Sequence, residues 1–399
     1  MKPISTIAKA VAPSATLAID ALAKQMKADG IDVIGFGAGE PDFNTPESVK
    51  AAGIRAIEEN KTRYTPAVGI LPLRQAISQW LDRECGVQYP PEQICVTSGA
   101  KHNVYVALQT LCNAGDEVIL PAPCWVTYAE AIKMANAVPV FIHTSEETRF
   151  KMTPEAFRRA ITPKTKCLIM TSPSNPTGMI YSRQELEAIA AVAVENDLYV
   201  ISDEIYNELV YAGEFTSFAA LSPEVKERTI LINGASKTFA MTGWRIGFAA
   251  ANPEIARVMG NYLSHSTGSA SSISQYAALE AFSARENLSA EMARAYAERR
   301  EYFLSRVSKI AGVSCLAPDG AFYIFMNVKE QIGRTLCGIP IRSSADFADA
   351  LLKKGLVAVV PGEAFSAPGY LRWSYAVSME NIAKGLDRLE SFLKGTPVA

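Results

Sequence analysis

The chain has 399 residues, more than twice the length of a typical single domain, so we expect two domains or one large α/β body. Apolar residues make up 49% of the sequence and charged residues 20%, which excludes a disordered, collagen-like or coiled-coil chain. With 39 basic and 41 acidic residues the formal charge is −2, so there is no basic surface for nucleic acid and no charged block for a membrane surface.

The cysteines, the histidines and the N-terminal segment indicate the compartment. Seven cysteines are scattered without a C-x-x-C pair, so we expect reduced thiols in a reducing compartment, and the three histidines lie too far apart for a metal centre. The first 20 residues loosely imitate a signal peptide, but Lys9 interrupts their apolar run and Asp20 follows it. No run approaches the roughly 18 apolar residues that span a bilayer. We therefore predict a cytoplasmic protein.

The first predicted element is a helix over residues 14–28, with Ile19, Leu22 and Met26 on one face. The glycine-rich segment that follows, residues 35–39, hints at a dinucleotide-binding turn. The third glycine that such a turn requires is missing, because the position holds glutamate, and the next residue is proline, which prevents the helix from starting there. Residues 234–238 imitate the end of a phosphate-binding P-loop but lack its glycine before the lysine. We reject both motifs.

From residue 90 to 250, short apolar runs alternate with amphipathic segments. One of these segments, residues 182–196, places Leu186, Ile189 and Val192 on one helix face. Strands that are apolar throughout and separated by helices predict a mostly parallel sheet of seven strands, buried on both faces. The strand candidates are residues 94–97, 117–120, 138–141, 167–171, 198–202, 229–233 and 246–250.

The C-terminal part of the sequence has a different pattern. From about residue 288 a long helical pattern begins, with Met292, Tyr296 and Phe303 in register. Three strand candidates follow it, at residues 321–328, 356–360 and 370–376. This order predicts a smaller α+β domain, joined by the N-terminal segment.

Chemically active side chains follow the predicted strands of the large sheet. In open parallel sheets, ligands bind beyond the carboxyl ends of the strands. One aromatic residue, one amide, acids, a phenol, a lysine and an arginine lie there, together with a turn that opens a helix. They are Ser98-Gly99-Ala100-Lys101, Trp125, Asn175, Asp203, Glu204, Tyr206, Lys237 and Arg245.

This set fits one cofactor, pyridoxal phosphate, which needs a lysine amine to bond its aldehyde carbon and an acid opposite its pyridine nitrogen. Lys237 and Asp203 supply these groups. Tyr206 and Asn175 suit the phenolic oxygen of the ring, and Trp125 offers an apolar face for stacking. An ionised aspartate keeps the pyridine nitrogen protonated, so the ring can accept electrons from a carbanion at the substrate Cα.

The phosphate of this cofactor suits the N–H groups of residues 98–101, where a helix begins, and the guanidinium of Arg245. Taken singly, each residue of the set has a simpler explanation. Lys237 can be a surface charge, Asp203 a helix N-cap and Asn175 a turn former. Their joint position at strand exits favours a site.

The strings GEPDF (39–43), NPTG (175–178), SDEIY (202–206) and SKTFAMTGWRIG (236–247) resemble class I, fold-type I pyridoxal-phosphate aminotransferases. The resemblance runs from about residue 3 to 395 and is strongest to the gamma subgroup of aspartate aminotransferases. It implies a homodimer whose active sites lie at the subunit interface. It also implies a large cofactor domain and a small domain built from both chain ends.

With the strand pattern, this gives an α/β fold whose large domain covers residues 46–289 and whose small domain covers residues 1–45 and 290–399. The resemblance further implies that Lys237 is the cofactor-bound lysine and proton carrier, and that Asp203 pairs with the pyridine nitrogen. The implied cofactor-binding residues are Gly99, Ala100, Lys101, Trp125, Asn175, Tyr206, Ser236, Arg245 and, reaching the neighbouring subunit, Tyr64. The implied substrate-binding residues are Gly39, Trp125, Asn175 and Arg372, the last of which grips the α-carboxylate bidentately.

One position departs from the family pattern. Many relatives have a phosphate-binding serine three residues before the lysine, where this chain has Gly234, and we expect Ser236 or a water molecule to replace it. On the substrate side, the resemblance implies that Lys101 binds a distal carboxylate, assisted by Ser14 and Thr16. The alternative is that Lys101 is a second charge for the phosphate.

The predicted reaction is L-aspartate + 2-oxoglutarate = oxaloacetate + L-glutamate. An aromatic, broad-range or prephenate aminotransferase is the alternative, although residue 12 is alanine where prephenate-accepting relatives tend to have lysine. A C–S β-lyase on the same cofactor is a further rival. A DNA-binding regulator with this fold is not expected, because we see no basic recognition segment before residue 14 or after residue 395.

Overall fold

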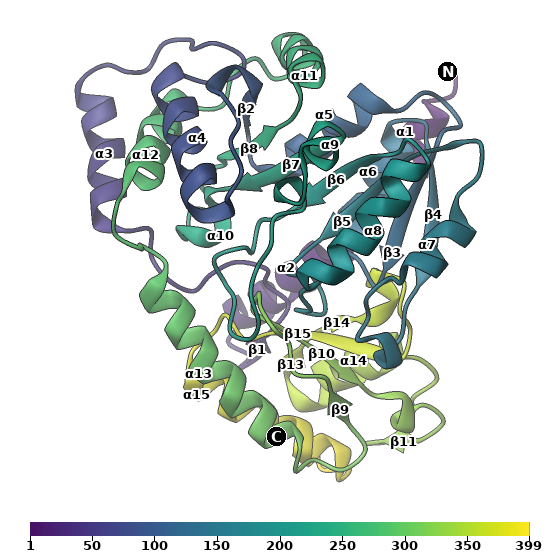
Figure 1. The fold of residues 1–399 in the computed structure, drawn as a ribbon. Coiled ribbons are helices and arrows are strands. Elements are labelled where there is room, and N and C mark those ends of the chain that lie inside the picture. Colours follow the sequence, from purple (N-terminus) through teal and green to yellow (C-terminus); the bar gives the residue numbers. More distant parts are fainter. Residues whose placement is uncertain (399) are drawn as a thin grey trace.

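A seven-stranded sheet lies at the centre of the computed structural model, which describes residues 1–398 (Figure 1). The strand order is β2-β8-β7-β6-β5-β3-β4, and neighbours run parallel except at β8, which is antiparallel to both β2 and β7. The strands are β2 (Ile94–Thr97), β3 (Glu117–Ala122), β4 (Val138–His143), β5 (Thr165–Thr171), β6 (Tyr199–Asp203), β7 (Thr229–Gly234) and β8 (Gly247–Ala250). The predicted mostly parallel sheet is confirmed.

Helices cover both faces of this sheet. Successive side chains of a strand point to opposite faces, so strands that are apolar throughout need a cover on both sides. Val118 and Ile201 pack on one face against α5 (Ala100–Leu111), α6 (Val126–Met134) and α11 (Pro253–His265). On the other face, Ile119 and Val200 pack against α7 (Pro154–Ala160), α8 (Arg183–Glu195) and α9 (Pro223–Glu227). Helices α4 (Leu71–Cys85) and α12 (Ser272–Ser283) cover that face near β2 and β8, and α3 (Glu47–Glu58) packs on α12.

A second, antiparallel sheet with the order β14-β15-β10-β9 lies below the first in Figure 1, where it is green to yellow. Its core includes Phe303, Phe347 and Trp373, which are fully buried. Its elements are α13 (Ala290–Val307), β9 (Ser314–Cys315), β10 (Tyr323–Asn327), the hairpin β11 (Thr335–Leu336) and β12 (Ile339–Pro340), α14 (Ser344–Gly355), β14 (Val360–Pro361), β15 (Tyr370–Ser374) and α15 (Met379–Leu393).

Residues 15–35 of the N-terminal segment join this second part. Strand β1 (Ile34–Gly35) pairs in parallel with β13 (Val357–Ala358), which joins the N-terminal segment to the C-terminal part of the chain. Before β1, helix α2 (Ala15–Ala28) packs through Ala23 and Met26. The predicted helix is confirmed, but its predicted apolar face is wrong at Leu22, which is 48% exposed, because Ala23 faces the core instead.

The predicted strand over residues 356–360 is also wrong as a single element. The structure divides it into β13 and β14, which belong to different sheets, because β13 pairs with β1 and β14 with β15. The change of partner occurs at Val359, which is buried. The two remaining short helices are α1 (Thr6–Ala10) and α10 (Ala235–Thr238).

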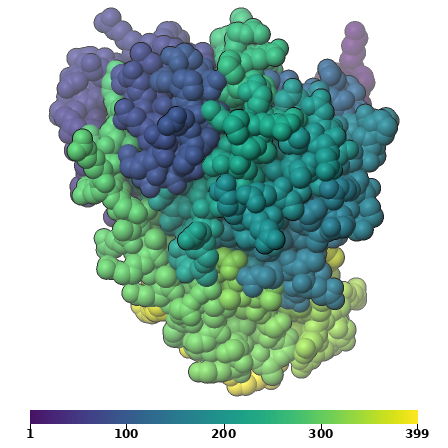
Figure 2. All heavy atoms as spheres, in the orientation of Figure 1, coloured from purple at the N-terminus to yellow at the C-terminus, as the bar shows by residue number. Residues whose placement is uncertain are grey.

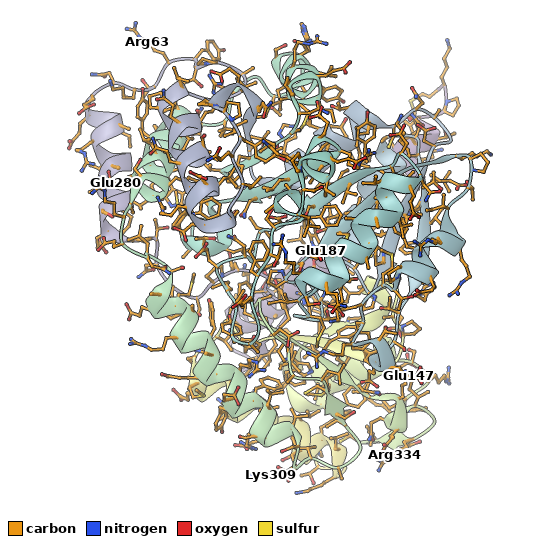
Figure 3. The ribbon with its side chains drawn as sticks, viewed as in Figure 1. Arg63, Glu147, Glu187, Glu280, Lys309 and Arg334 are labelled. Atoms are coloured by element: carbon orange, nitrogen blue, oxygen red, sulfur yellow. The ribbon has the colours of Figure 1, made fainter. Side chains whose placement is uncertain are left out.

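Charged side chains lie mainly on the outside. In Figure 2 the C-terminal residues sit directly beneath the sheet-bearing part, and in Figure 3 Arg63, Lys309 and Arg334 project from the edge of the molecule. No helix within residues 1–398 has both the length and the apolar character needed to cross a bilayer.

Candidate active site

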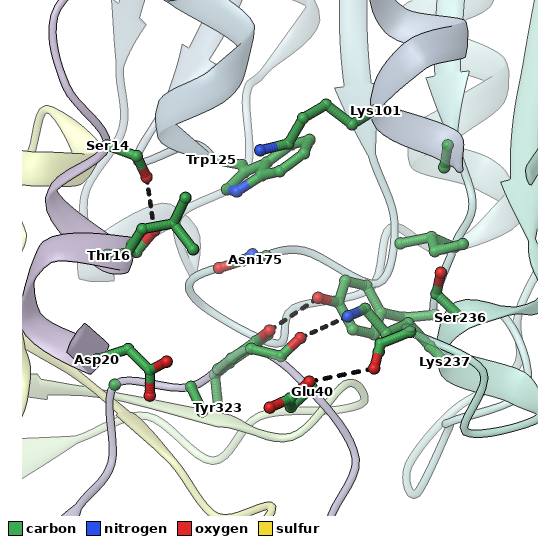
Figure 4. A pocket seen from close by; sticks show the side chains of 18 of the residues that line it. Ser14, Thr16, Asp20, Glu40, Lys101, Trp125, Asn175, Ser236, Lys237 and Tyr323 are labelled. Atoms are coloured by element: carbon green, nitrogen blue, oxygen red, sulfur yellow. Dashed lines mark hydrogen bonds between the residues drawn. The ribbon is translucent and has the colours of Figure 1, made fainter. Parts of the chain in front are cut away.

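A cavity of about 460 Å³ opens at the carboxyl ends of β5 and β6, between the two sheets (Figure 4). Thr171 and Asp203 reach it from the large sheet, and Tyr323 and Arg372 reach it from the small one. Most of the predicted site residues line it. They are Ser14, Thr16, Gly39, Ala100, Lys101, Trp125, Asn175, Asp203, Tyr206, Ser236, Lys237, Arg245 and Arg372.

Two predicted residues do not line the cavity. Gly99 has a φ of 90° and packs against Arg245, where an added Cβ would lie 2.5 Å from Nη2. Tyr64 is fully exposed in the single chain. Its predicted role concerns a neighbouring subunit, so it stays a prediction.

Asp203 is the last residue of β6 and its side chain is buried. The hydroxyl of Tyr128 donates to Oδ2 at 2.8 Å, and the N–H of Ile205 donates to Oδ1 at 3.2 Å. Burial raises the pKa of the Asp203 carboxyl to about 6, while the hydrogen bonds from Tyr128 and Ile205 and the charge of Lys237 act in the opposite direction. The group is therefore ionised above neutral pH.

Lys237 lies in the short helix α10, which directly follows β7. Its ammonium donates to the carbonyl of Gly39. Burial, together with the nearby charges of Arg245 and Arg372, lowers the pKa of Lys237 to about 8, although Glu40 and Asp203 act in the opposite direction. A lysine with such a pKa is partly neutral near pH 7 to 8, so it can act as a base and a nucleophile.

Arg372 is a buried guanidinium on β15. Nη1 donates to Oδ1 of Asn175 at 3.1 Å and Nη2 donates to the carbonyl of Gly37 at 2.6 Å, while Nε is buried without a partner. Its guanidinium carbon lies 4.5 Å from the ring centre of Tyr323. A buried charge without a counter-ion is costly, so this arrangement favours an anionic ligand.

Three other cations of the cavity also lack a counter-ion. Within residues 1–398, no carboxylate oxygen lies within ion-pair distance of Lys101, Lys237 or Arg245. Five basic and three acidic side chains line the cavity, and one basic–acidic pair, Lys24 and Asp20, is already joined at 2.8 Å. The excess positive charge suits a ligand with several negative charges.

The turn before α5 forms an anion-binding corner with Arg245. Nη1 of Arg245 donates to the carbonyl of Thr242 at 3.0 Å and Nη2 to that of Ser98 at 3.3 Å. The backbones approach closely, since a Cβ added at Gly247 would lie 2.2 Å from the nitrogen of Ala100. The first N–H groups of α5 and the guanidinium thus border the same cavity, which suits a phosphate.

The glycine at position 234 has a structural reason. A Cβ there would lie 2.7 Å from Cα of Gly247 and 2.8 Å from the carbonyl oxygen of Ile246, so the backbone leaves no room for a serine side chain. Ser236 lines the cavity instead and is 7% exposed. That Ser236 or a water molecule replaces the missing serine at the phosphate stays a prediction.

Lys101, Ser14 and Thr16 lie at the other end of the cavity (Figure 4). The hydroxyls of Ser14 and Thr16 are 3.1 Å apart. The ammonium of Lys101 lies 5.1 Å from the ring centre of Trp125, and burial together with Arg245 lowers the pKa of Lys101. This cluster can bind a second anionic group.

Sequence reasoning missed several lining residues. Tyr128 lies three positions after Trp125, so the helical spacing could have indicated that both face the site. Tyr323, whose hydroxyl lies 2.8 Å from that of Tyr206, falls in an apolar strand and gave no signal. Asp20 and Glu40 also line the cavity and were read only as exclusions of other motifs.

A family model described as aminotransferase class I and II matches residues 31–389. The chain belongs to this family. It is 47% identical over 387 residues to an aspartate aminotransferase of Bacillus sp. (strain YM-2), covering 97% of this chain and 98% of the relative. It is 43% identical to an aspartate/prephenate aminotransferase of Cereibacter sphaeroides, covering 96% and 97%.

The structure of the aspartate aminotransferase from Thermus thermophilus with maleate is similar to this fold, with a TM-score of 0.93, 42% identity, and coverage of 98% of this chain and 100% of that one. As a member of the family, the chain is an aminotransferase, and the predicted family and fold class are confirmed.

Proposed function

We propose that the protein transfers the amino group of L-aspartate to 2-oxoglutarate and uses pyridoxal phosphate as its cofactor. The observation that supports this most directly is Arg372, a buried guanidinium without an acidic partner, in the same cavity as Lys237 and the buried Asp203. The relatives named aspartate aminotransferase, and the bound maleate of one solved relative, a dicarboxylate, support the same substrate class.

The residues present fit pyridoxal phosphate. A buried acid and a buried lysine of lowered pKa border one cavity, and Gly99 and Gly247 allow the close backbone approach that leaves room beside Arg245. When bound, this cofactor carries the amino group and accepts the electron pair released when the substrate Cα–H bond breaks. Lys237 would bond it and Asp203 would face its pyridine nitrogen. The other holding residues would be Gly99, Ala100, Trp125, Asn175, Tyr206, Ser236 and Arg245.

The residues of the chain then position the substrate and move its proton. Arg372 binds the α-carboxylate with its planar fork, assisted by Asn175 and the backbone at Gly39, which fixes the direction of the Cα–H bond. Nζ of Lys237, neutral in part because its pKa is about 8, would take the proton from Cα and donate it to the cofactor carbon that carries the amino group. One amine thus serves as base and as acid.

Lys101, Ser14 and Thr16 are proposed to bind the distal carboxylate of aspartate. The test compares kcat/KM for aspartate and phenylalanine in Lys101→Met. We expect a fall of about 100-fold for aspartate and a change of only a few-fold for phenylalanine, because the ion pair with the distal carboxylate is lost for one substrate alone. Lys133→Met is the control, since Lys133 pairs with Glu130 at 2.9 Å outside the cavity.

The same experiment separates the two interpretations of Lys101. If its charge serves the phosphate, kcat/KM falls equally for both amino acids and cofactor affinity falls with it. That result would contradict the distal-carboxylate role. Comparable wild-type kcat/KM for phenylalanine and aspartate would contradict the dicarboxylate preference.

Prephenate is the second candidate substrate, because the Cereibacter sphaeroides relative is named for aspartate and prephenate. Residue 12, which is alanine, lies beside α6, where its N–H donates to Glu130 at 2.9 Å. It offers no cation, so we expect prephenate to react less efficiently than aspartate. Release of pyruvate and ammonia without a keto acid would instead indicate a C–S β-lyase.

The assembly is also a proposal. We propose a homodimer in which Tyr64 reaches the phosphate site of the other subunit. Its full exposure supports this, as does the exposure of Ile54 and Ile57 on the preceding helix α3, at 57% and 54%. The proposed large domain is residues 46–289, and the small one is residues 1–45 and 290–399. Sedimentation velocity tests the dimer. The cytoplasmic location stays a prediction.

A further inference from the structure

Tyr128 makes the shortest hydrogen bond to Asp203, and the proposed function gives it no role. It lies in α6, is 2% exposed, and its hydroxyl is 2.8 Å from Oδ2 of Asp203. The same hydroxyl lies 2.6 Å from Oγ1 of Thr171. Three elements, α6, β5 and β6, therefore meet at one phenol oxygen at the floor of the cavity.

The direction of these hydrogen bonds follows from the number of protons. A phenol has one proton, and a carboxylate can only accept. Tyr128 therefore donates to Asp203, and the hydroxyl of Thr171 donates to Tyr128. Thr171 and Asp203 are register partners in the parallel pairing of β5 and β6, so the backbone holds both ends of this chain of bonds in place.

We propose that Tyr128, oriented by Thr171, is a positioning residue that keeps the Asp203 carboxylate ionised and directed at the pyridine nitrogen of the cofactor. This inference rests on the proposed function, because it assumes that pyridoxal phosphate binds against Asp203. Tyr128 acts through Asp203 and performs no bond-making step.

The surroundings of Asp203 explain why such a donor is needed. Burial favours its protonated form, and Glu204, the next residue, is a second buried acid. The groups that favour the carboxylate are Tyr128 from α6, the N–H of Ile205 at 3.2 Å and the charge of Lys237 from α10. Tyr206 adds no positive charge. Without the Tyr128 hydroxyl, only the longer backbone bond and Lys237 would oppose protonation.

The test is Tyr128→Phe, which removes the hydroxyl and keeps the ring that packs edge-on against Trp125 at 5.3 Å. The measurement is the dissociation constant of pyridoxal phosphate for the cofactor-free protein between pH 6 and 9. We expect binding about twofold weaker than wild type at pH 7, about fivefold weaker at pH 6 and nearly equal at pH 9, because losing a hydrogen bond to a charged group raises the pKa of Asp203 from about 6 by about one unit. The pH midpoint of the visible absorbance of the bound cofactor should also move upward.

Two further variants separate this role from a packing defect. Thr171→Val should shift the same profile in the same direction by a smaller amount, because Tyr128 keeps its bond to Asp203 but loses its orienting donor. Tyr181→Phe is the matched control. Its buried hydroxyl accepts the N–H of Met152 at 2.8 Å and it does not line the cavity, so it should lower stability and leave the pH profile unchanged.

An affinity ratio between wild type and Tyr128→Phe that is the same at pH 6 and pH 9 would overturn the inference and leave the proposed function standing. A wild-type protein that takes up no pyridoxal phosphate at any pH would overturn the proposed function, and the inference with it.

Discussion

Asp203 and Glu204 are consecutive buried acids, yet they belong to two different regions. Asp203 lines the cavity, whereas Glu204 lies in an enclosed cluster away from it. In that cluster, one oxygen of Glu204 accepts bonds from the hydroxyls of Ser202 and Ser217 at 2.8 and 3.0 Å and from the N–H of Phe218 at 3.0 Å. One oxygen of the enclosed acid is thus held by neutral donors of its own chain, and the other, Oε2, is buried without a partner.

The cavity differs from this cluster in the partners of its charged side chains. The cations Lys101, Lys237, Arg245 and Arg372 have no carboxylate partner among residues 1–398, although that range holds 20 ion pairs, of which only Lys24–Asp20 borders the cavity. Buried charges normally find partners within the protein, so those that do not are poised for ligands. Cations without a carboxylate partner, rather than burial alone, therefore mark the site.

The largest effect is expected at Lys237. Lys237→Ala should reduce turnover by about 10⁴-fold or more, because it removes both the proton carrier and the covalent attachment. Cofactor binding through Asp203 and Arg245 should remain in part. Steady-state kinetics measure the loss and far-UV circular dichroism checks the fold. Turnover close to wild type would remove Lys237 from its role.

A smaller effect is expected at Arg372. Arg372→Lys keeps the charge but loses the planar fork and the bonds to Asn175 and Gly37, so kcat/KM should fall by about 100-fold for every amino acid. The control is Arg388→Lys. Arg388 is also buried but pairs with Asp32 at 2.6 Å, so it should change stability and leave kcat/KM within a few-fold. Equal losses in the two variants would contradict the comparison.

The smallest effect on activity is expected at Glu204. Burial raises the pKa of Glu204 to about 7, well above that of an unfolded glutamate. The folded state therefore binds more protons than the unfolded state between about pH 4.5 and 7, and wild-type stability falls as pH rises through that window. Glu204→Gln lacks this proton, so its stability relative to wild type should rise by up to about 3 kcal/mol between pH 5 and 8.

Urea unfolding midpoints at pH 5 and pH 8 measure this difference. Activity of Glu204→Gln should stay within a few-fold of wild type. A pH-independent stability difference, or a loss of activity as large as that at Arg372, would show that Glu204 is not confined to the enclosed cluster.

The large sheet could be predicted because its strands are apolar along their whole length and its helices carry one apolar face. Lys237 and Asp203 could be found because they directly follow such strands. The strand over residues 356–360 could not be divided correctly. Its two halves pair with different strands, β1 and β15, and no local sequence pattern shows which partner a strand will have. The prediction that Leu22 lies on the packed face of α2 was wrong for a related reason, since that face is set by a distant part of the chain.

The missed site residues are those that look like core residues in the sequence. Tyr128 and Tyr323 are almost completely buried and occur among apolar neighbours, and only the folded chain shows which groups their hydroxyls meet. Gly234 is the opposite case. The sequence showed the missing serine, but only the approach of Gly247 explains it.

The most direct test of the account is the place where pyridoxal phosphate attaches. The purified protein is mixed with the cofactor, treated with borohydride to make any nitrogen–carbon link permanent, digested and analysed by mass spectrometry. We expect a single modified peptide with the cofactor on Lys237, and a much smaller amount of this peptide in Asp203→Asn. Modification spread over surface lysines, or none at all, would contradict it.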